Sequence, residues 1–190
     1  MRQLLLIVSV HLFLFLVLFA YHAQADEDQW YVEEFDTFIV AAVPGEVIHG
    51  DKLRFFIRKS DCSKVGMLFS FSTSKKPKAI KNLQNQKLPI RINDYDSIRG
   101  AKVVSVHEME FITIVMMQTP GNHEIREFIG ALQTMYDFEK EFRIELVRHD
   151  GHDPEKYFDI FHNNWKLDLL IEKIEIARNM CLGPDEIRKT

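Results

Sequence analysis

The first 25 residues decide which part of this chain folds. A single Arg2 precedes a predominantly apolar run from Leu4 to Ala20, and Ala23-Gln24-Ala25 then leads into an acidic segment. A cationic start, an apolar run shorter than a spanning helix of about 20 residues, and small residues at the −1 and −3 positions are typical of a cleaved secretory signal peptide. We therefore expect a mature chain that begins at Asp26 and is exported to the periplasm or the extracellular space.

A retained leader is the alternative. An apolar run of this length can cross a thin bilayer when its flanking residues reach the interface. The chain would then be a membrane-tethered sensor, and we expect contact with a membrane only in that case.

The charge and the length of the mature chain limit which partners and how many domains it can have. Removal of the leader takes away one of the 24 Lys and Arg residues and leaves 23 against 28 Asp and Glu residues, a formal net charge of −5. Nucleic-acid binders need a basic surface to neutralise phosphates, so we expect no nucleic acid as a partner. The remaining 165 residues suffice for one well-buried core. They predict a single domain over residues 26–190.

The chain contains two cysteines, Cys62 and Cys181, and both belong to the expected mature part. In an oxidising compartment, an even pair far apart in the sequence is most simply one disulfide. Two buried thiols are the alternative. Neither cysteine has a second one nearby, which excludes a C-x-x-C redox or metal motif.

Strand-like segments dominate the first part of the mature chain. Runs rich in Phe, Ile and Val alternate there with short turn segments. Pro89 cannot donate to a sheet ladder, so its strand is expected at an edge or to begin there. The run from Phe111 to Met117 is apolar on both faces, which predicts a central strand covered on both sides. The expected strands are Asp36 to Val43, Lys52 to Arg58, Val65 to Phe71, Leu88 to Ile92, and Phe111 to Met117.

Helical periodicity begins after residue 121. Apolar residues recur at helical spacing from Ile125 to Met135, which predicts a helix from His123 to Tyr136 with Asn122 as its N-cap. Alternation returns at Phe142, Ile144 and Leu146, and we expect the segment from Tyr157 to Phe161 to pair with it as a hairpin.

The clearest helix comes last. One apolar stripe runs from Leu167 to Cys181, with Asn163 or Asn164 as a candidate cap and Gly183-Pro184 as the end. These elements predict a β-rich α+β domain, in which a mostly antiparallel sheet or sandwich is covered by two helices.

Candidate metal ligands gather in one turn. His149, Asp150, His152 and Asp153 lie close together in the sequence, and imidazole with carboxylate suits zinc or a related ion. Asp-Gly and Asp-Pro steps are also favoured in turns for backbone reasons alone. We interpret the segment as a turn and expect neither a metal nor another cofactor.

Motifs for catalysis are weak. His123 and Glu127 resemble part of the zinc-protease helix motif, but that motif needs a second histidine where this chain has Glu127. The chain also lacks a Gly-x-Ser-x-Gly elbow and a phosphate-binding glycine loop. A small secreted hydrolase or metal-dependent enzyme, with a site assembled from distant residues, stays the alternative to a noncatalytic protein.

Two groups of side chains are candidates for surface contacts. Lys75, Lys76, Lys78 and Lys81 form the nearest thing to a charge run, which we interpret as a solvated loop, with docking to anionic lipid or polysaccharide as the alternative. Aromatic side chains could instead bind a protein or glycan partner. The aromatic candidates are Tyr31, Phe35, Tyr95 and Tyr157.

The order of these features resembles the invasion-associated locus B-like group of exported bacterial proteins. The matching pieces are the leader, a strand opening at Trp30, the segment KLPIRIND, a helix EIREFIGALQ before EFRIELV, and a closing helix WKLDLLIEKIEIARNMC. Extra cysteines common in that group are missing, and FDIFHNNW replaces a glycine-centred turn. The resemblance implies a β-rich periplasmic or surface-associated protein without known enzymatic chemistry, and it transfers no site residues.

The sequence thus favours a noncatalytic exported protein. We expect it to act through contacts with another protein or with a component of the cell envelope.

Overall fold

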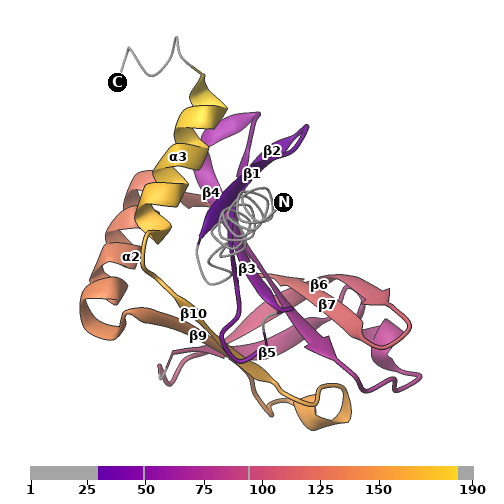
Figure 1. Ribbon diagram of the computed structural model, residues 1–190. Helices are drawn as coiled ribbons and strands as arrows, with labels where there is room; N and C mark the ends of the chain where they lie inside the picture. The colour runs from indigo at the N-terminus through magenta and orange to yellow at the C-terminus, as the bar shows by residue number, and fades with distance from the viewer. Residues whose placement is uncertain (1–29, 49, 94, 184–190) are drawn as a thin grey trace, which may run out of the picture.

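A computed structural model describes residues 30–48, 50–93 and 95–183 (Figure 1). The expected signal peptide, its cleavage site and the polar tail after Gly183 lie outside the described residues. Within these ranges the chain forms ten strands, two α-helices and two short 3-10 helices.

The ten strands belong to one antiparallel sheet. Its order is β1-β2-β3-β4-β7-β6-β5-β9-β10, and the two-residue β8 pairs with the beginning of β4. The predicted β-rich α+β class is therefore confirmed, with a single sheet rather than a sandwich. The strands are β1 (Tyr31–Glu34), β2 (Phe38–Pro44), β3 (Lys52–Arg58), β4 (Asp61–Thr73), β5 (Lys87–Ile92), β6 (Ile98–Glu108), β7 (Thr113–Gln118), β8 (His123–Glu124), β9 (Glu141–Leu146) and β10 (His162–Lys166).

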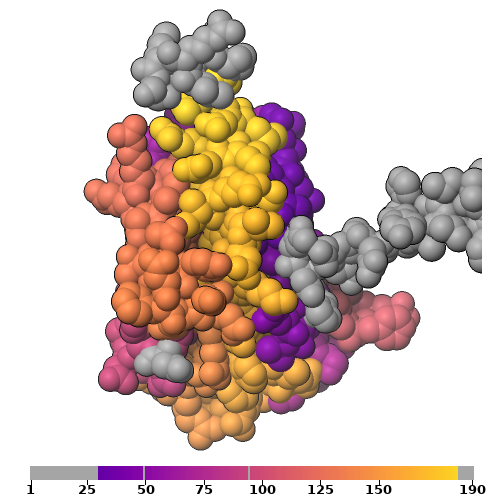
Figure 2. Space-filling view, turned by 60° about the vertical axis from the view of Figure 1, so that its left-hand side comes forward, coloured from indigo at the N-terminus to yellow at the C-terminus, as the bar shows by residue number. Residues whose placement is uncertain are grey.

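The two helices pack against neighbouring parts of the sheet and meet over β4. The helices α2 (Ile125–Glu139) and α3 (Leu170–Leu182) lie side by side (Figure 1 and Figure 2). Helix α3 packs against β1 to β4, and α2 packs against β4, β8 and β9. The largest fully buried side chains are Trp165, Phe55, Phe69, Phe71 and Phe158.

The core aromatics connect strands that are distant in the sequence. Phe71 of β4 makes edge contacts with Phe158 and with Trp165 of β10, at ring-centroid distances of 6.1 and 6.5 Å. Such edge-to-face pairs add to the free energy of burying the rings. The short 3-10 helix η1 (Ile80–Leu83) buries Ile80 and Leu83, and η2 (Pro154–Lys156) buries Pro154.

The loop between β2 and β3 joins the two ends of the sheet. The amide of Val47 donates to Oδ1 of Asn163 in β10 (2.9 Å), and Asn163 Nδ2 donates to the carbonyl of Ile48 (3.1 Å). Gly45 is required here, since a Cβ would lie 2.2 Å from the Asn163 side chain. The glycine therefore lets the loop approach β10 closely enough to make these bonds.

Asp51 completes this contact from within the core. Its side chain is fully buried, and it accepts hydrogen bonds from the amide and hydroxyl of Ser72 (2.6 and 2.7 Å) and from Asn163 Nδ2 (3.1 Å). Burial raises the pKa of Asp51 to about 6, although the hydrogen bonds from Ser72 and Asn163 act in the opposite direction.

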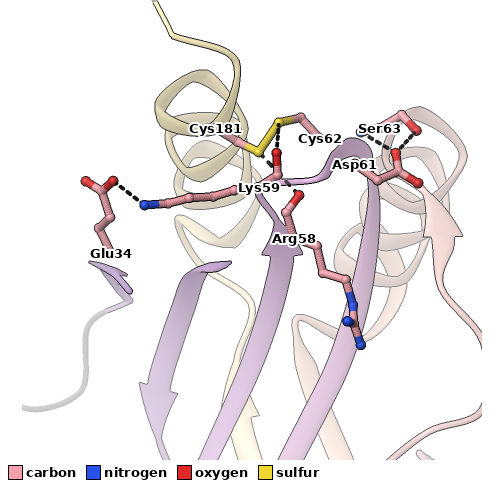
Figure 3. Close-up of a disulfide and its surroundings, with 7 residues drawn as sticks. All are labelled: Glu34, Arg58, Lys59, Asp61, Cys62, Ser63 and Cys181. Carbon is pink, nitrogen blue, oxygen red and sulfur yellow. Dashed lines mark hydrogen bonds and ion pairs between the residues drawn. A yellow bond between two sulfur atoms is a disulfide. The ribbon is translucent and has the colours of Figure 1, made fainter. Parts of the chain in front are cut away.

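A disulfide fastens the end of α3 to the sheet. Cys62, at the start of β4, lies 5.7 Å from Cys181 in Cα–Cα distance, and their sulfur atoms are bonded (Figure 3). This is the pairing that the cysteine count predicts. Nearby, Lys59 forms an ion pair with Glu34 of β1 (2.7 Å), and Asp61 accepts hydrogen bonds from Ser63 (Figure 3).

Two expectations about strands are wrong. Strand β5 lies between β6 and β9 rather than at an edge. The carbonyl of Pro89 accepts from the amide of Val147, just beyond the end of β9, so the missing N–H falls where no ladder partner is needed. Phe111 and Ile112 lie in the turn before β7. The rest of the run forms β7, which is central between β4 and β6 as predicted, but its residues alternate between buried and half-buried and are not covered on both sides.

Two expectations about helix ends are also wrong. His123 and Glu124 pair with β4 as β8, so α2 begins at Ile125 and Asn122 does not cap it. Asn163 and Asn164 belong to β10, and α3 begins only at Leu170. In both cases a backbone ladder with a distant strand takes the residues that local capping rules would assign to the helix.

The hairpin partner of β9 also differs from the prediction. Residues 162–166, rather than Tyr157 to Phe161, pair with β9 as β10. The intervening chain instead forms η2 and places Phe158 in the core.

Removal of the disulfide is expected to destabilise the protein. Cys181→Ser should lower the free energy of unfolding by roughly 2 to 5 kcal/mol, because the bridge closes a long loop in the unfolded chain. Chemical denaturation measures this loss, and hydrogen exchange should show faster opening of α3 than of the central strands. Free thiols at both positions in the exported protein, or unchanged exchange across α3, would contradict the assignment.

Asp51 should make the protein less stable as the pH rises. The folded-state pKa of Asp51, about 6, exceeds the unfolded value of 3.8. Its contribution to the free energy of unfolding is therefore complete below the unfolded pKa and is lost as the pH rises through the folded pKa. Between about pH 4.5 and 7.5, the loss should be about 2 kcal/mol larger in the wild type than in Asp51→Asn, measured by urea denaturation. An equal pH dependence in the two proteins would show that Asp51 titrates normally.

Candidate functional site

A cavity of about 450 Å³ lies between α2 and the sheet. Its size falls within the range of about 300 to 1,000 Å³ that is usual for sites of small ligands. Apolar side chains make up most of its wall, and polar and charged side chains supply the rest. The lining residues are Met67, Ile92, Tyr95, Ser97, Arg99, Thr119, Pro120, His123, Glu127, Phe128, Ala131, Leu132, Met135 and Phe142.

The apolar wall of the cavity comes from α2 and three strands. On α2, Phe128, Leu132 and Met135 recur at the spacing that places them on one face of a helix. The opposite wall consists of Met67 in β4, together with a residue each from β5 and β9. Since these strands come from distant parts of the sequence, the cavity exists only after the sheet has assembled.

The ends of α2 are fixed by contacts with the sheet. Pairing of β8 with residues 64–65 of β4 anchors the chain just before the helix. At the other end Lys140 adopts a left-handed conformation (φ 56°), and its carbonyl accepts a hydrogen bond from the amide of Leu167. These contacts hold α2 above the sheet.

Polar groups approach the cavity from two sides. Tyr95, Ser97 and Arg99 come from the connection between β5 and β6 and from the start of β6, while His123 and Glu127 come from β8 and α2. Within the described part of the chain, Arg99 and Glu127 make neither ion pairs nor side-chain hydrogen bonds. Both are exposed, so they remain available to a ligand.

His123 is held by an aromatic contact. Its ring stacks on Phe128 with a centroid distance of 5.8 Å and an interplanar angle of 19°. The stacked arrangement places one imidazole next to the apolar wall. There it can donate a hydrogen bond to the polar group of a ligand or accept one from it.

Such an arrangement suits an amphipathic molecule. An apolar body would bury its surface against the helix and the strands, and a polar end would meet the arginine, histidine and carboxylate groups. Arg99 in particular can donate two hydrogen bonds to a carboxylate or phosphate.

The structure brings one of the four predicted contact aromatics to this cavity. Tyr95 lines it with 52% of its surface exposed. Tyr31 instead lies below Lys52, whose ammonium donates to its hydroxyl (2.8 Å), and Phe35 packs on Phe38. Tyr157 stacks on His152 with an interplanar angle of 2°.

The histidine-rich segment forms a tight turn. His149 and His152 exchange backbone hydrogen bonds, and Asp150 and Gly151 between them have φ values of 48° and 80°. Two positive φ values are the signature of a type I′ hairpin turn, which favours Asp-Gly. Backbone geometry thus explains this part of the sequence.

The four side chains of the turn do not converge on one point. Asp153 accepts from the amide of Glu155 and pairs with Arg148 (3.2 Å), whereas His149 Nε2 lies 3.2 Å from Asp150. Burial lowers the pKa of His152. Among the described residues, no three His, Cys, Asp or Glu side chains are placed to hold a metal ion.

Most residues of the cavity carry no sequence signal that would identify them. Arg99, Ser97 and Thr119 sit in unremarkable local contexts, and their shared position depends on the order of the sheet. One local signal of the cavity is Ala131 on α2. Its small side chain lies between larger apolar residues of the helix and leaves space beside them.

Comparisons with protein-family models, curated proteins and solved structures give no match to this chain. The resemblance to the locus B-like group stays a prediction from the sequence layout.

Across the described ranges, no helix is both long enough and apolar enough to cross a membrane.

Zinc is expected to leave the melting temperature unchanged. A metal that binds the native state at 100 times its dissociation constant would stabilise it by about 2.7 kcal/mol, which thermal unfolding easily detects. A zinc-dependent rise that disappears in the His149→Ala/His152→Ala double variant would establish a metal site at the turn.

Proposed function

We propose that this protein is a noncatalytic exported binding protein, whose ligand is a small amphipathic molecule held between α2 and the sheet. The observation that carries this proposal is the cavity of about 450 Å³, whose lining is mostly apolar and includes polar and charged side chains from two sides. The Cys62–Cys181 disulfide is compatible with an oxidising compartment, either the periplasm or the extracellular space.

The energetics favour a ligand with an apolar chain. Each methylene transferred from water into such a cavity gains about 0.8 kcal/mol. A chain of about eight methylenes would gain roughly 6 kcal/mol before the cost of immobilisation, and contacts to its head group would add to this. A lipid-derived amphiphile of the cell envelope has this chemistry, which agrees with the expectation of an envelope component as partner.

The polar groups at the cavity support binding rather than proton transfer. Catalytic acids and bases are usually desolvated, which tunes their pKa values. His123 and Glu127 are exposed instead. Asp51, whose pKa is raised to about 6, does not line the cavity and is bonded to Ser72 and Asn163.

A fluorescent apolar probe tests the proposal. The exported protein should bind N-phenyl-1-naphthylamine saturably, and Ala131→Trp should weaken binding by about tenfold or more because the indole fills the cavity. Gln133→Trp is the matched control: it lies on the same helix, is exposed, and does not line the cavity. Melting temperatures verify that both variants fold.

Two results would overturn the proposal. One is saturable binding that Ala131→Trp leaves unchanged. The other is hydrolysis of a fatty-acid nitrophenyl ester that His123→Ala abolishes, since this would favour the secreted-hydrolase alternative.

A further inference from the structure

The turn between β6 and β7 presents three large apolar side chains to solvent. Met109, Phe111 and Ile112 are 53%, 76% and 38% exposed. The hairpin runs away from the two helices, and in Figure 2 it stands out from the body of the molecule (Figure 1 and Figure 2). Turns are usually built from small polar residues, so folding does not explain this composition.

Part of the backbone of this turn already has hydrogen-bond partners. The amide of Met109 donates to the carbonyl of Ile112 (2.8 Å). Lys76 Nζ donates to the carbonyl of Met109 (3.2 Å) and to that of Glu110. Each of these bonds lowers the cost of moving the turn out of water, because a bonded carbonyl loses less on desolvation than a free one.

Positive charge lies beside this turn. The segment from Lys76 to Lys81 contacts the hairpin through Lys76 and Lys81 and contains three lysines, against two glutamates in residues 108–112, so the two segments together carry a formal charge of +1. Glu108 is paired with Lys81 at 2.6 Å. The whole chain has a net charge of −4, so this end is opposite in sign to the molecule.

We propose that the β6–β7 turn docks on bilayers that contain anionic lipids. Met109, Phe111 and Ile112 enter the interface between head groups and acyl chains, and Lys76 and Lys78 lie at the level of the phosphates. A convex apolar tip above a basic base fits a deformable lipid surface better than the flat complementary face of a protein partner. The contact is independent of the N-terminal apolar segment.

Vesicle binding of the exported protein tests this proposal. Vesicles of phosphatidylcholine with roughly one third phosphatidylglycerol should bind the protein more tightly than pure phosphatidylcholine. Phe111→Ser should weaken this binding by about tenfold or more. Phe138→Ser is the matched control, because Phe138 is 83% exposed at the far end of α2.

Charge is tested separately. Lys78→Glu should weaken binding to the anionic vesicles by about fivefold or more and should hardly affect binding to neutral ones. Lys102→Glu, an exposed position in the middle of β6, is its control. Intact mass on each variant ensures that all share the same N-terminus, so that differences arise from the hairpin.

A spectroscopic variant reports the insertion directly. The emission of Phe111→Trp should shift to shorter wavelength when anionic vesicles are added. Emission that stays water-like, vesicle binding equal in Phe111→Ser and the wild type, or no binding at all would overturn the proposal and leave the turn as a contact for protein.

Discussion

The contact between the β2–β3 loop and β10 holds the fold together, because it joins strands from opposite ends of a nine-strand path. Asn163 exchanges hydrogen bonds with Val47, Ile48 and Asp51, and it can do so only because Gly45 leaves room for its side chain. Two further contacts join β10 to the beginning of the described chain. The indole of Trp30 donates to the carbonyl of Lys166 (2.7 Å), and Lys166 pairs with Glu46 (3.0 Å).

The contact between the β2–β3 loop and β10 also supports the cavity. Strand β10 pairs with β9, which supplies part of the cavity wall, and the residue after β10 bonds to the end of α2. A sheet whose ends were free could flatten, and α2 would lose its support on that side. Asp51 adds to this contact, and loss of its hydrogen bonds from Ser72 and Asn163 would leave a buried carboxyl without partners.

Local sequence signals predict the elements that need no distant partner. The bounds of β3 match the Phe- and Ile-rich run, and the Asp150-Gly151 turn follows from its dipeptide. Errors occur where pairing with another strand competes for the same residues. Asn163 and Asn164 are good helix caps, yet β9 binds them in a ladder.

The cavity could not be predicted for the same physical reason. Its residues lie on β4, β5, β6, β8, β9 and α2 and in the connections before β6 and β8, and periodicity in one segment carries no information about which strands become neighbours. The sequence predicts Tyr95 only as one of four aromatic candidates for partner contacts. Its place beside Arg99 depends on the connection between β5 and β6, which folds toward α2.

Strand β6 connects the two surfaces to which we assign binding. Arg99 at its start lines the cavity, and Met109 directly follows its end. Ten residues of strand span about 33 Å, and the register shift near Val103 shortens this only slightly. A bilayer held at the turn therefore lies too far from the cavity for a lipid to pass directly between them. Ligand binding and membrane docking therefore use separate parts of the molecule, so a change at Ala131 should leave docking intact, and a change at Phe111 should leave the cavity intact.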